Sequence, residues 1–175
     1  MKKTILTTLF VIIAFISINV QAQEKINWLT FEQAIAKNDK NPKPILVDLY
    51  TDWCGWCKKM DKTTYENNSI IKYLNEHYYA VKMNGEGKDD IFFNGKTYKY
   101  IEQGRVKYHE LAAQIMKGQM SYPSTAFFDV EKRLIQTVPG YLSEQRFEKI
   151  INFFTKDHYK TTEWTTFEKE FKSAM

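Results

Sequence analysis

Residues 44–58 read Pro-Ile-Leu-Val-Asp-Leu-Tyr-Thr-Asp-Trp-Cys-Gly-Trp-Cys-Lys and contain the only two cysteines of the 175-residue chain. A proline followed by apolar and β-branched residues predicts a short buried strand over 45–50. Cys54 and Cys57 follow at positions i and i+3, where a helix is expected to begin. The order of strand, Cys-x-x-Cys and helix favours reversible redox chemistry, whereas the same pair in isolation would equally be half of a zinc site.

A structural role for this cysteine pair is less convincing than a catalytic one. A bond between Cys54 and Cys57 would close a loop of very few residues. Such a short crosslink removes little entropy from the unfolded chain and therefore stabilises the fold only weakly. A zinc site would need two further ligands, and the three histidines, His77, His109 and His158, share no metal-binding spacing. We therefore expect no metal and a redox-active pair.

The first 22 residues have the pattern of a secretory signal peptide. Two lysines precede an apolar run over 5–18, and Val20 and Ala22 place small residues before a cut after Ala22. An uncleaved anchor is the alternative, but about 14 apolar residues are short against the roughly 20 that span a bilayer. We expect cleavage, a periplasmic or secreted location and no stable membrane insertion afterwards.

The charge balance of the chain excludes some classes of partner. The formal net charge is +4, and loss of the two lysines in the signal segment would lower it to +2. Acidic and basic residues are interspersed along the sequence, so nothing indicates binding to nucleic acid or to a membrane surface.

The remaining chain is expected to form one α/β domain over 23–160, followed by a tail at 161–175. We expect helices over about 31–38, 54–64 and 108–117, a shorter helical turn from 68, a long helix capped by Ser143, and strands over 45–50, 78–83, 124–130 and 133–138. This order predicts a central mixed sheet with helices on both sides. The tail is interpreted as a short amphipathic helix that docks Trp164, Phe167 and Phe171 on the body, with a partner-binding peptide as the alternative.

Residues at about 84–107 form an insertion of a different character. A polar, glycine-containing loop is followed by Asn94-Gly95 between aromatic and β-branched residues, which is a strong hairpin signal. Because the carboxyl ends of parallel strands gather at one edge of a sheet, the insertion should emerge on the side of the cysteines and form one wall of a substrate groove. A local mini-core is the alternative for its aromatic side chains, Phe92, Phe93, Tyr98 and Tyr100.

The two cysteines are expected to have different roles. Cys54 would lie at a helix N-terminus, where unpaired N–H groups and the helix dipole stabilise a thiolate. Cys57, one turn later and more shielded, would attack a mixed disulfide formed on Cys54. Lys58 adds positive potential, whereas Trp56 brings no ionisable group between the cysteines. We therefore expect a moderate-to-reducing couple and not a strong oxidant.

With these residues in view, the chain resembles the thioredoxin superfamily over roughly residues 43–155. The matching segments are Lys43-Pro44-Ile45-Leu46-Val47-Asp48, Trp53-Cys54-Gly55-x-Cys57-Lys58, Tyr122-Pro123-Ser124-Thr125 and Gly140. The resemblance implies a thioredoxin-like fold with an insertion before the cis-proline loop. The departures are Trp56, where thioredoxin has proline, and the insertion at 84–107.

The resemblance also implies roles for individual residues. Asp48 matches the buried carboxylate behind the second cysteine, and Lys82 matches the lysine that pairs with it. From the residues alone, a lone Asp in an apolar strand is expected to have a raised pKa, unless it is hydrogen-bonded at a strand edge. Pro123 is expected to be cis, which would expose the backbone of Tyr122 to an extended substrate. The residues expected to contact substrate are Trp53, Gly55, Trp56, Tyr122 and Pro123.

These observations predict an extracytoplasmic thiol–disulfide oxidoreductase that reduces protein disulfides and needs no cofactor. Its partners would be disulfide-containing proteins and a membrane or soluble thiol electron donor. A disulfide isomerase or oxidase of secreted proteins is the alternative within the same class. A non-catalytic binding module with a thioredoxin-like fold is the alternative from another class.

Overall fold

The structure is a computed structural model that describes residues 24–173. The predicted signal peptide and its cut after Ala22 lie outside these residues. Among the helices within 24–173, none is long and apolar enough to cross a membrane.

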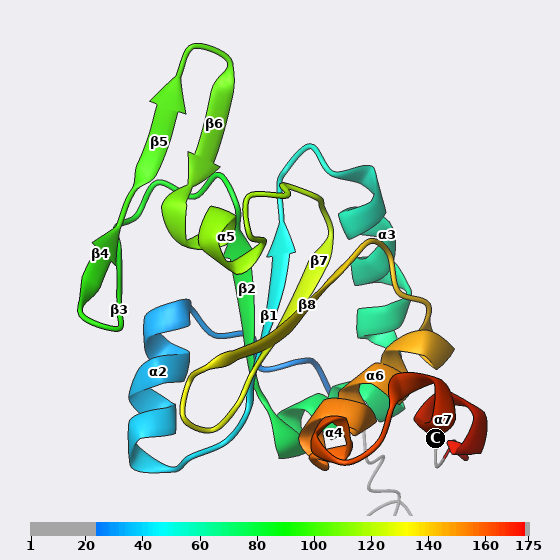
Figure 1. The fold of residues 1–175 in the computed structure, drawn as a ribbon. Helices are drawn as coiled ribbons and strands as arrows, with labels where there is room; N and C mark the ends of the chain where they lie inside the picture. The colour runs from blue at the N-terminus through cyan, green and yellow to red at the C-terminus, as the bar shows by residue number, and fades with distance from the viewer. Residues whose placement is uncertain (1–23, 174–175) are drawn as a thin grey trace, which may run out of the picture.

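A four-stranded mixed sheet forms the centre of the molecule (Figure 1). The strands lie in the order β2 (Tyr79–Asn84), β1 (Ile45–Tyr50), β7 (Ser124–Phe128) and β8 (Leu134–Pro139). β1 and β2 are parallel, whereas β7 is antiparallel to both β1 and β8. The predicted central mixed sheet is therefore confirmed.

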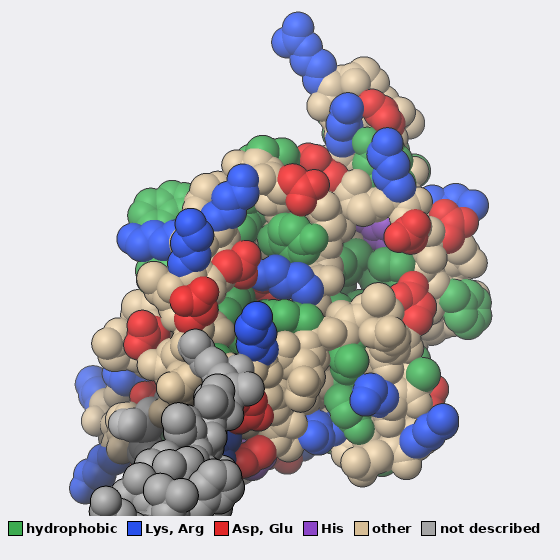
Figure 2. Space-filling view, turned by 180° about the vertical axis from the view of Figure 1, so that it is seen from behind, with side chains coloured by type: hydrophobic (Ala, Val, Ile, Leu, Met, Phe, Trp, Pro, Cys, Tyr) green, Lys and Arg blue, Asp and Glu red, His purple; other side chains and the backbone are tan. Residues whose placement is uncertain are grey.

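Helices cover both faces of this sheet, as Figure 1 shows. One face carries α2 (Phe31–Lys40) and α5 (Glu110–Ile115). The other carries α3 (Gly55–Lys62), α4 (Asn68–His77), α6 (Glu144–Thr155) and α7 (Trp164–Glu170), with 3-10 turns at Thr64–Glu66 and His158–Lys160. Each face has its own apolar core, because successive residues of a strand point to opposite sides of the sheet. The space-filling view from behind shows acidic and basic side chains interspersed over the surface (Figure 2).

Local sequence signals explain where most helices begin. α2 starts with a complete capping box, in which Thr30 accepts a hydrogen bond from the Gln33 N–H while the Gln33 side chain accepts one from Thr30. Ser143 caps α6 as expected. Asn67 accepts two N–H groups at the start of α4, which runs ten residues and is longer than the predicted turn.

The insertion contains two β-hairpins. The first, β3 (Ile91–Phe93) and β4 (Lys96–Tyr98), has the predicted Asn94-Gly95 turn, with both turn residues at positive φ. The second, β5 (Tyr100–Gln103) and β6 (Val106–His109), was not predicted and projects beyond the body at the end where α3 begins (Figure 1). The helix expected over 108–117 is correspondingly shorter, because its first two residues pair with β5 instead.

The aromatic residues of the insertion do not form a core of their own. Phe93 and Tyr98 are buried in the core shared by α2, α5 and the sheet. The Phe93 ring meets the Phe31 ring edge-on at 5.0 Å between centroids. Phe92 is 63% exposed. The first hairpin is therefore part of the domain core, and the mini-core interpretation is wrong for Phe93 and Tyr98.

The C-terminal segment contacts the body through aromatic side chains. Phe167 of α7 is buried, and its ring lies 5.0 Å from that of Phe153 on α6. Trp164 meets the same Phe153 ring edge-on at 5.3 Å, and the Phe171 ring lies tilted against that of Phe167 at 5.4 Å.

Candidate active site

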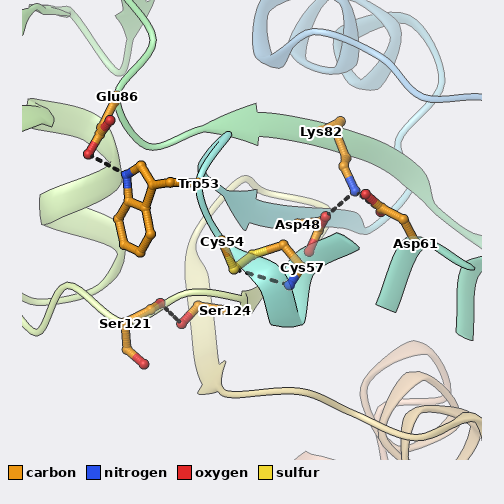
Figure 3. Close-up of a disulfide and its surroundings, with 9 residues drawn as sticks. All are labelled: Asp48, Trp53, Cys54, Cys57, Asp61, Lys82, Glu86, Ser121 and Ser124. Atoms are coloured by element: carbon orange, nitrogen blue, oxygen red, sulfur yellow. Dashed lines mark hydrogen bonds and ion pairs between the residues drawn. A yellow bond between two sulfur atoms is a disulfide. The ribbon is translucent and has the colours of Figure 1, made fainter. Parts of the chain in front are cut away.

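The two cysteines form a disulfide at the start of α3 (Figure 3). The sulfur atoms are 2.01 Å apart, and Cys54 is the N-cap residue of the helix. The Cys57 N–H donates a hydrogen bond to Cys54 Sγ at 3.1 Å. Cys54 and Cys57 are 4% and 3% exposed, so the expected difference in shielding is small in this oxidised form.

The position of Cys54 suits the chemistry of a thiolate. Its sulfur accepts one of the backbone N–H groups that a helix leaves unpaired in its first turn. After reduction the same N–H and the helix dipole would favour the charged form of this thiol. The N-cap residue, whose sulfur accepts the N–H of the third residue of α3, is thus also the residue assigned as nucleophile.

A buried carboxylate lies on the sheet beneath α3. Asp48 on β1 stands beside Lys82 on β2 in the parallel register, and its Oδ2 lies 2.7 Å from Lys82 Nζ (Figure 3). On its other side Asp48 is paired with Thr125 of β7. The predicted pairing of Asp48 with Lys82 is present.

Burial and the neighbouring charges together shift the pKa values of Asp48 and Lys82. Burial raises the pKa of the Asp48 carboxyl above its ordinary 3.8, although the Lys82 ammonium opposes the shift. Burial also lowers the pKa of Lys82, but the carboxylates of Asp48 and Asp61 outweigh it, so the pKa of Lys82 is raised. Lys82 therefore stays cationic near neutral pH, while Asp48 is set to bind a proton at a higher pH than an ordinary carboxyl group.

Asp61 is a residue of this cluster that the sequence reasoning missed. It is half-buried on α3 and its Oδ1 accepts a hydrogen bond from Lys82 Nζ. Its spacing in the sequence would have indicated this position, because Asp61 follows Cys57 by four residues and so lies one turn along the same helix face. Three aromatic rings surround the same ammonium at about 5 Å, those of Trp28, Tyr50 and Tyr65.

Two large apolar side chains flank the disulfide at the surface. Trp53 is 67% and Trp56 58% exposed. The Trp53 indole N–H donates to Glu86 Oε1 at 3.0 Å (Figure 3). The Trp53 ring meets that of Tyr122 edge-on, with 6.0 Å between centroids. Trp56 lies against Tyr141 instead, with 5.6 Å between ring centroids. Lys58 and Gly55 are exposed beside them.

The loop before β7 brings the predicted proline to this end of the sheet. The Tyr122–Pro123 peptide bond is cis, as expected. Pro123 is buried, and its carbonyl accepts a hydrogen bond from the Gly140 N–H at 2.8 Å. The next residue, Ser124, pairs with Leu49 near the end of β1, and Figure 3 shows this loop beside the disulfide.

The insertion also contributes to the site at its first residues, which the sequence reasoning did not single out. Gly85 packs so closely on Tyr122 that a Cβ atom there would lie 2.0 Å from the tyrosine oxygen. Its amide donates to the Tyr50 carbonyl, and its carbonyl accepts from the His109 N–H at 2.7 Å. Burial raises the pKa of the Tyr122 hydroxyl to about 12, and the charge of Glu86 adds to the shift. Any side chain at this position would require the Tyr122 ring to move.

The histidines do not belong to the site. His109 is buried under the insertion, where its Nδ1 accepts the Leu111 N–H and its Nε2 bonds to the Asp89 carbonyl. Over residues 24–173 there is no cluster of three or more His, Cys, Asp or Glu side chains that would hold a metal ion.

Comparison with known proteins assigns the fold to a family. A family model described as a thioredoxin-like domain matches residues 31–155. The chain belongs to this family. A solved thioredoxin-fold protein from Helicobacter pylori superposes with a TM-score of 0.57 at 19% identity, covering 74% of this chain and 84% of that one.

Two curated bacterial proteins are similar over the same domain. The thiol:disulfide interchange protein DsbD of Pseudoalteromonas atlantica is 38% identical over 119 residues, covering 67% of this chain and 17% of that protein. The disulfide bond reductase DsbH of Chlamydia pneumoniae is 27% identical over 111 residues, covering 63% of this chain and 60% of that protein. The chain thus spans less than two thirds of either relative, and a tenth or less of several others. Together, the family and the Cys54–Cys57 pair show a site of the thiol–disulfide oxidoreductase type.

Proposed function

We propose that this protein reduces disulfide bonds of other proteins outside the cytoplasm. The observation that carries the proposal is the Cys54–Cys57 disulfide at the N-terminus of α3, with the buried Asp48–Lys82 pair behind it. A purely structural crosslink would need neither the helix N-terminus nor a buried acid. The similarity to proteins named as a disulfide interchange protein and a disulfide bond reductase supports the same chemistry.

The reaction begins with the reduced pair. The Cys54 thiolate attacks one sulfur of a substrate disulfide, forms a mixed disulfide and expels the other substrate sulfur as a thiolate. The Cys57 thiolate then attacks Cys54 Sγ, closes the Cys54–Cys57 bond and releases the second substrate thiolate. The substrate gains two electrons and, in water, two protons, while the pair loses two electrons.

Asp48 is assigned to proton transfer in the second step. Cys57 must lose its proton before it attacks, and a buried carboxylate whose pKa is raised binds a proton more readily than an ordinary one. The pair with Lys82 keeps Asp48 in place. Trp53, Tyr122 and Pro123 are assigned to binding of an extended substrate, and the first residues of the insertion form a wall beside them through the contact of Glu86 with Trp53.

The electrons for the next cycle come from a dithiol protein, either in the membrane or soluble, because the proposed compartment has no ready supply of nicotinamide. This donor reduces the Cys54–Cys57 disulfide by the same exchange in the opposite direction. The proposed location rests on the signal-like pattern at 1–22.

The test is reduction of insulin by the protein with dithiothreitol as the electron source. Wild type should accelerate insulin precipitation, and Cys54→Ser should abolish the acceleration. Gln114→Ser, on the exposed surface of α5, serves as the control. Activity that survives in Cys54→Ser would reject the assigned nucleophile, and an inactive wild type would favour a binding module.

Equilibration with glutathione buffers separates reduction from the alternative roles. We expect a reduction potential well below the about −120 mV of a strong oxidant, because Trp56 offers no charge to stabilise the Cys54 thiolate further. A potential close to that of the strong oxidant would instead support an oxidase or isomerase.

A further inference from the structure

Trp56 lies in a preformed cluster beside the disulfide. Trp56, Lys59 and Thr63 follow one another on one face of α3 at intervals of three and four residues. Lys59 Nζ lies 4.8 Å from the centre of the Trp56 ring and 5.1 Å from that of Tyr141. The Tyr141 hydroxyl is 3.2 Å from Thr63 Oγ1, which donates in turn to the Lys59 carbonyl. We call these four residues the Trp56 platform.

The platform keeps an apolar surface open to solvent next to the reacting sulfurs. Trp56 is 58% exposed although it packs on Tyr141 and Lys59, so part of its indole ring remains free. Large exposed aromatic side chains at a protein surface are characteristic of binding sites, and Trp is among the residues that contribute most there. Since its neighbours already hold the ring in place, little side-chain entropy is lost when a ligand packs on it.

The charges on α3 beside the platform are mostly basic. Lys58, Lys59 and Lys62 are all exposed on α3, and within residues 24–173 none of them forms an ion pair with an acid. The only acid of the helix, Asp61, is engaged by Lys82. In Figure 2 basic side chains gather with exposed apolar ones at the upper left, over α3. A carboxylate on the ligand would complement these ammonium groups.

We propose that the Trp56 platform selects the protein substrate: it binds an extended polypeptide segment that carries an aromatic side chain and a carboxylate next to its half-cystine. The aromatic side chain packs on the free face of Trp56, and the carboxylate lies near Lys59. This inference rests on the proposed reductase function and adds its substrate class.

The experiment compares four short peptides, each a homodimer joined by one disulfide. The cysteine is flanked by Phe and Glu, by Phe and Gln, by Ala and Glu, or by Ala and Gln. Pre-reduced protein is mixed with each dimer, the reaction is stopped by alkylation, and released peptide thiol is measured chromatographically. A single turnover needs no electron donor, so each rate constant reports on the encounter of Cys54 with the peptide.

Wild type is expected to react about tenfold faster with the Phe–Glu peptide than with the Ala–Gln peptide. Trp56→Ala should lose the preference for Phe but keep that for Glu, and Lys59→Gln should do the reverse. The preference for Glu should also decline in high salt, whereas that for Phe should not.

Matched controls lie on the first hairpin of the insertion. Phe92 is 63% exposed, and Lys96 Nζ lies 4.5 Å from the centre of the Tyr98 ring. Phe92→Ala therefore removes an exposed aromatic ring, and Lys96→Gln an ammonium group over a ring, at another surface. Both should leave all four rate constants unchanged. Equal reduction of the four peptides by wild type, or a uniform loss in Trp56→Ala, would overturn the inference while leaving the reductase function standing. No reduction of any peptide would reject both.

Discussion

β1 sends Ile45, Val47 and Leu49 to one face of the sheet and Leu46 and Asp48 to the other. Toward α2 and α5 the strand therefore buries only apolar side chains. Toward α3 it buries a carboxylate as well, and its neighbours Lys82 and Thr125 continue the polar row across three strands. One strand thus supplies both a structural face and a reactive face.

The reactive face of β1 is bordered by more buried polar groups than the structural face. Within residues 24–173, six buried side-chain oxygens have no hydrogen-bond partner. Three belong to Asp48, Tyr65 and Thr125 around the polar row, and two more, in Thr51 and Tyr122, lie near the disulfide loops. Asp48, Tyr65 and Thr125 still interact with one another, but their geometry is poorer than that of well-formed hydrogen bonds, which makes their burial unfavourable. Both faces of the sheet are anchored by an apolar core, and the face toward α3 buries in addition the polar groups that bind and release a proton.

The largest effect is expected from a cavity on the structural face. Ile45 is fully buried at the start of β1, at the opposite end of the strand from the cysteines. Ile45→Ala should lower the free energy of unfolding by about 2–5 kcal/mol in urea titrations. The folded variant should keep the wild-type rate constant for peptide reduction, and a rate loss of more than about threefold would mean that the two faces are not independent.

Next in size is the loss of the proton acceptor on the reactive face. Asp48→Asn removes the carboxylate behind Cys57 but keeps its shape, and general base catalysis contributes about 10²–10⁴-fold in enzymes. We expect insulin reduction at pH 7 to decrease about 100-fold, at the step in which Cys57 resolves the mixed disulfide. An unchanged rate in the variant would remove Asp48 from the mechanism.

The same variant should change the pH dependence of stability. The pKa of Asp48 is raised by burial, so the folded protein keeps its proton to a higher pH than the unfolded chain does. Wild type therefore loses stability as the pH rises above about 3.8 and through the raised value. Asn does not titrate, and in the variant Lys82 still has the Asp61 carboxylate as an ion-pair partner. We expect Asp48→Asn to be more stable than wild type by about 1–2 kcal/mol at pH 8 and no more stable at pH 3.

The smallest predicted effect concerns His109, on the structural face of the sheet. There, stability decreases as the pH falls, whereas at Asp48 it decreases as the pH rises. Burial lowers the pKa of His109 below 6.5, although the Asp89 carbonyl and nearby acids oppose the shift. The unfolded chain thus binds the proton first as the pH decreases, and stability falls below pH 6.5. Protonation also removes the acceptor that caps α5.

A cap of this kind contributes about 1 kcal/mol. Amide hydrogen exchange at Leu111, referenced to its intrinsic rate, should be about fivefold less protected at pH 5 than at pH 7. His109→Asn keeps a capping group that does not titrate and should show no such change. Equal pH dependence in the variant and wild type would exclude His109 as the cause.

Sequence reasoning predicted features that depend on neighbouring residues. The strand over 45–50, the capping box at Thr30 and the Asn94-Gly95 turn each have a signal within a few positions. The pairing of Asp48 with Lys82 came from the resemblance to a family and not from spacing. The second hairpin was missed because its strands are only four residues long, and four of their eight residues are polar, so the segment resembles a loop.

The unpredicted part of the site consists of contacts between distant segments. Glu86 reaches Trp53 across 33 positions, and Tyr141 reaches Trp56 across 85 positions of the chain. Such pairs depend on how helices and loops pack on the sheet, which no local pattern encodes. Asp61 is the exception, since a helix that starts at Cys54 already places it one turn beyond Cys57.

The most direct measurement is capture of the mixed disulfide. Cys57→Ser, reduced and then mixed with the Phe–Glu peptide dimer, cannot resolve the intermediate, so intact-mass spectrometry should find one peptide bound through Cys54 and released by dithiothreitol. Cys54→Ser, treated in the same way, should bind almost none. If Cys57→Ser stays unmodified, or if both variants bind peptide equally, Cys54 is not the nucleophile and the account of the reactive face is contradicted.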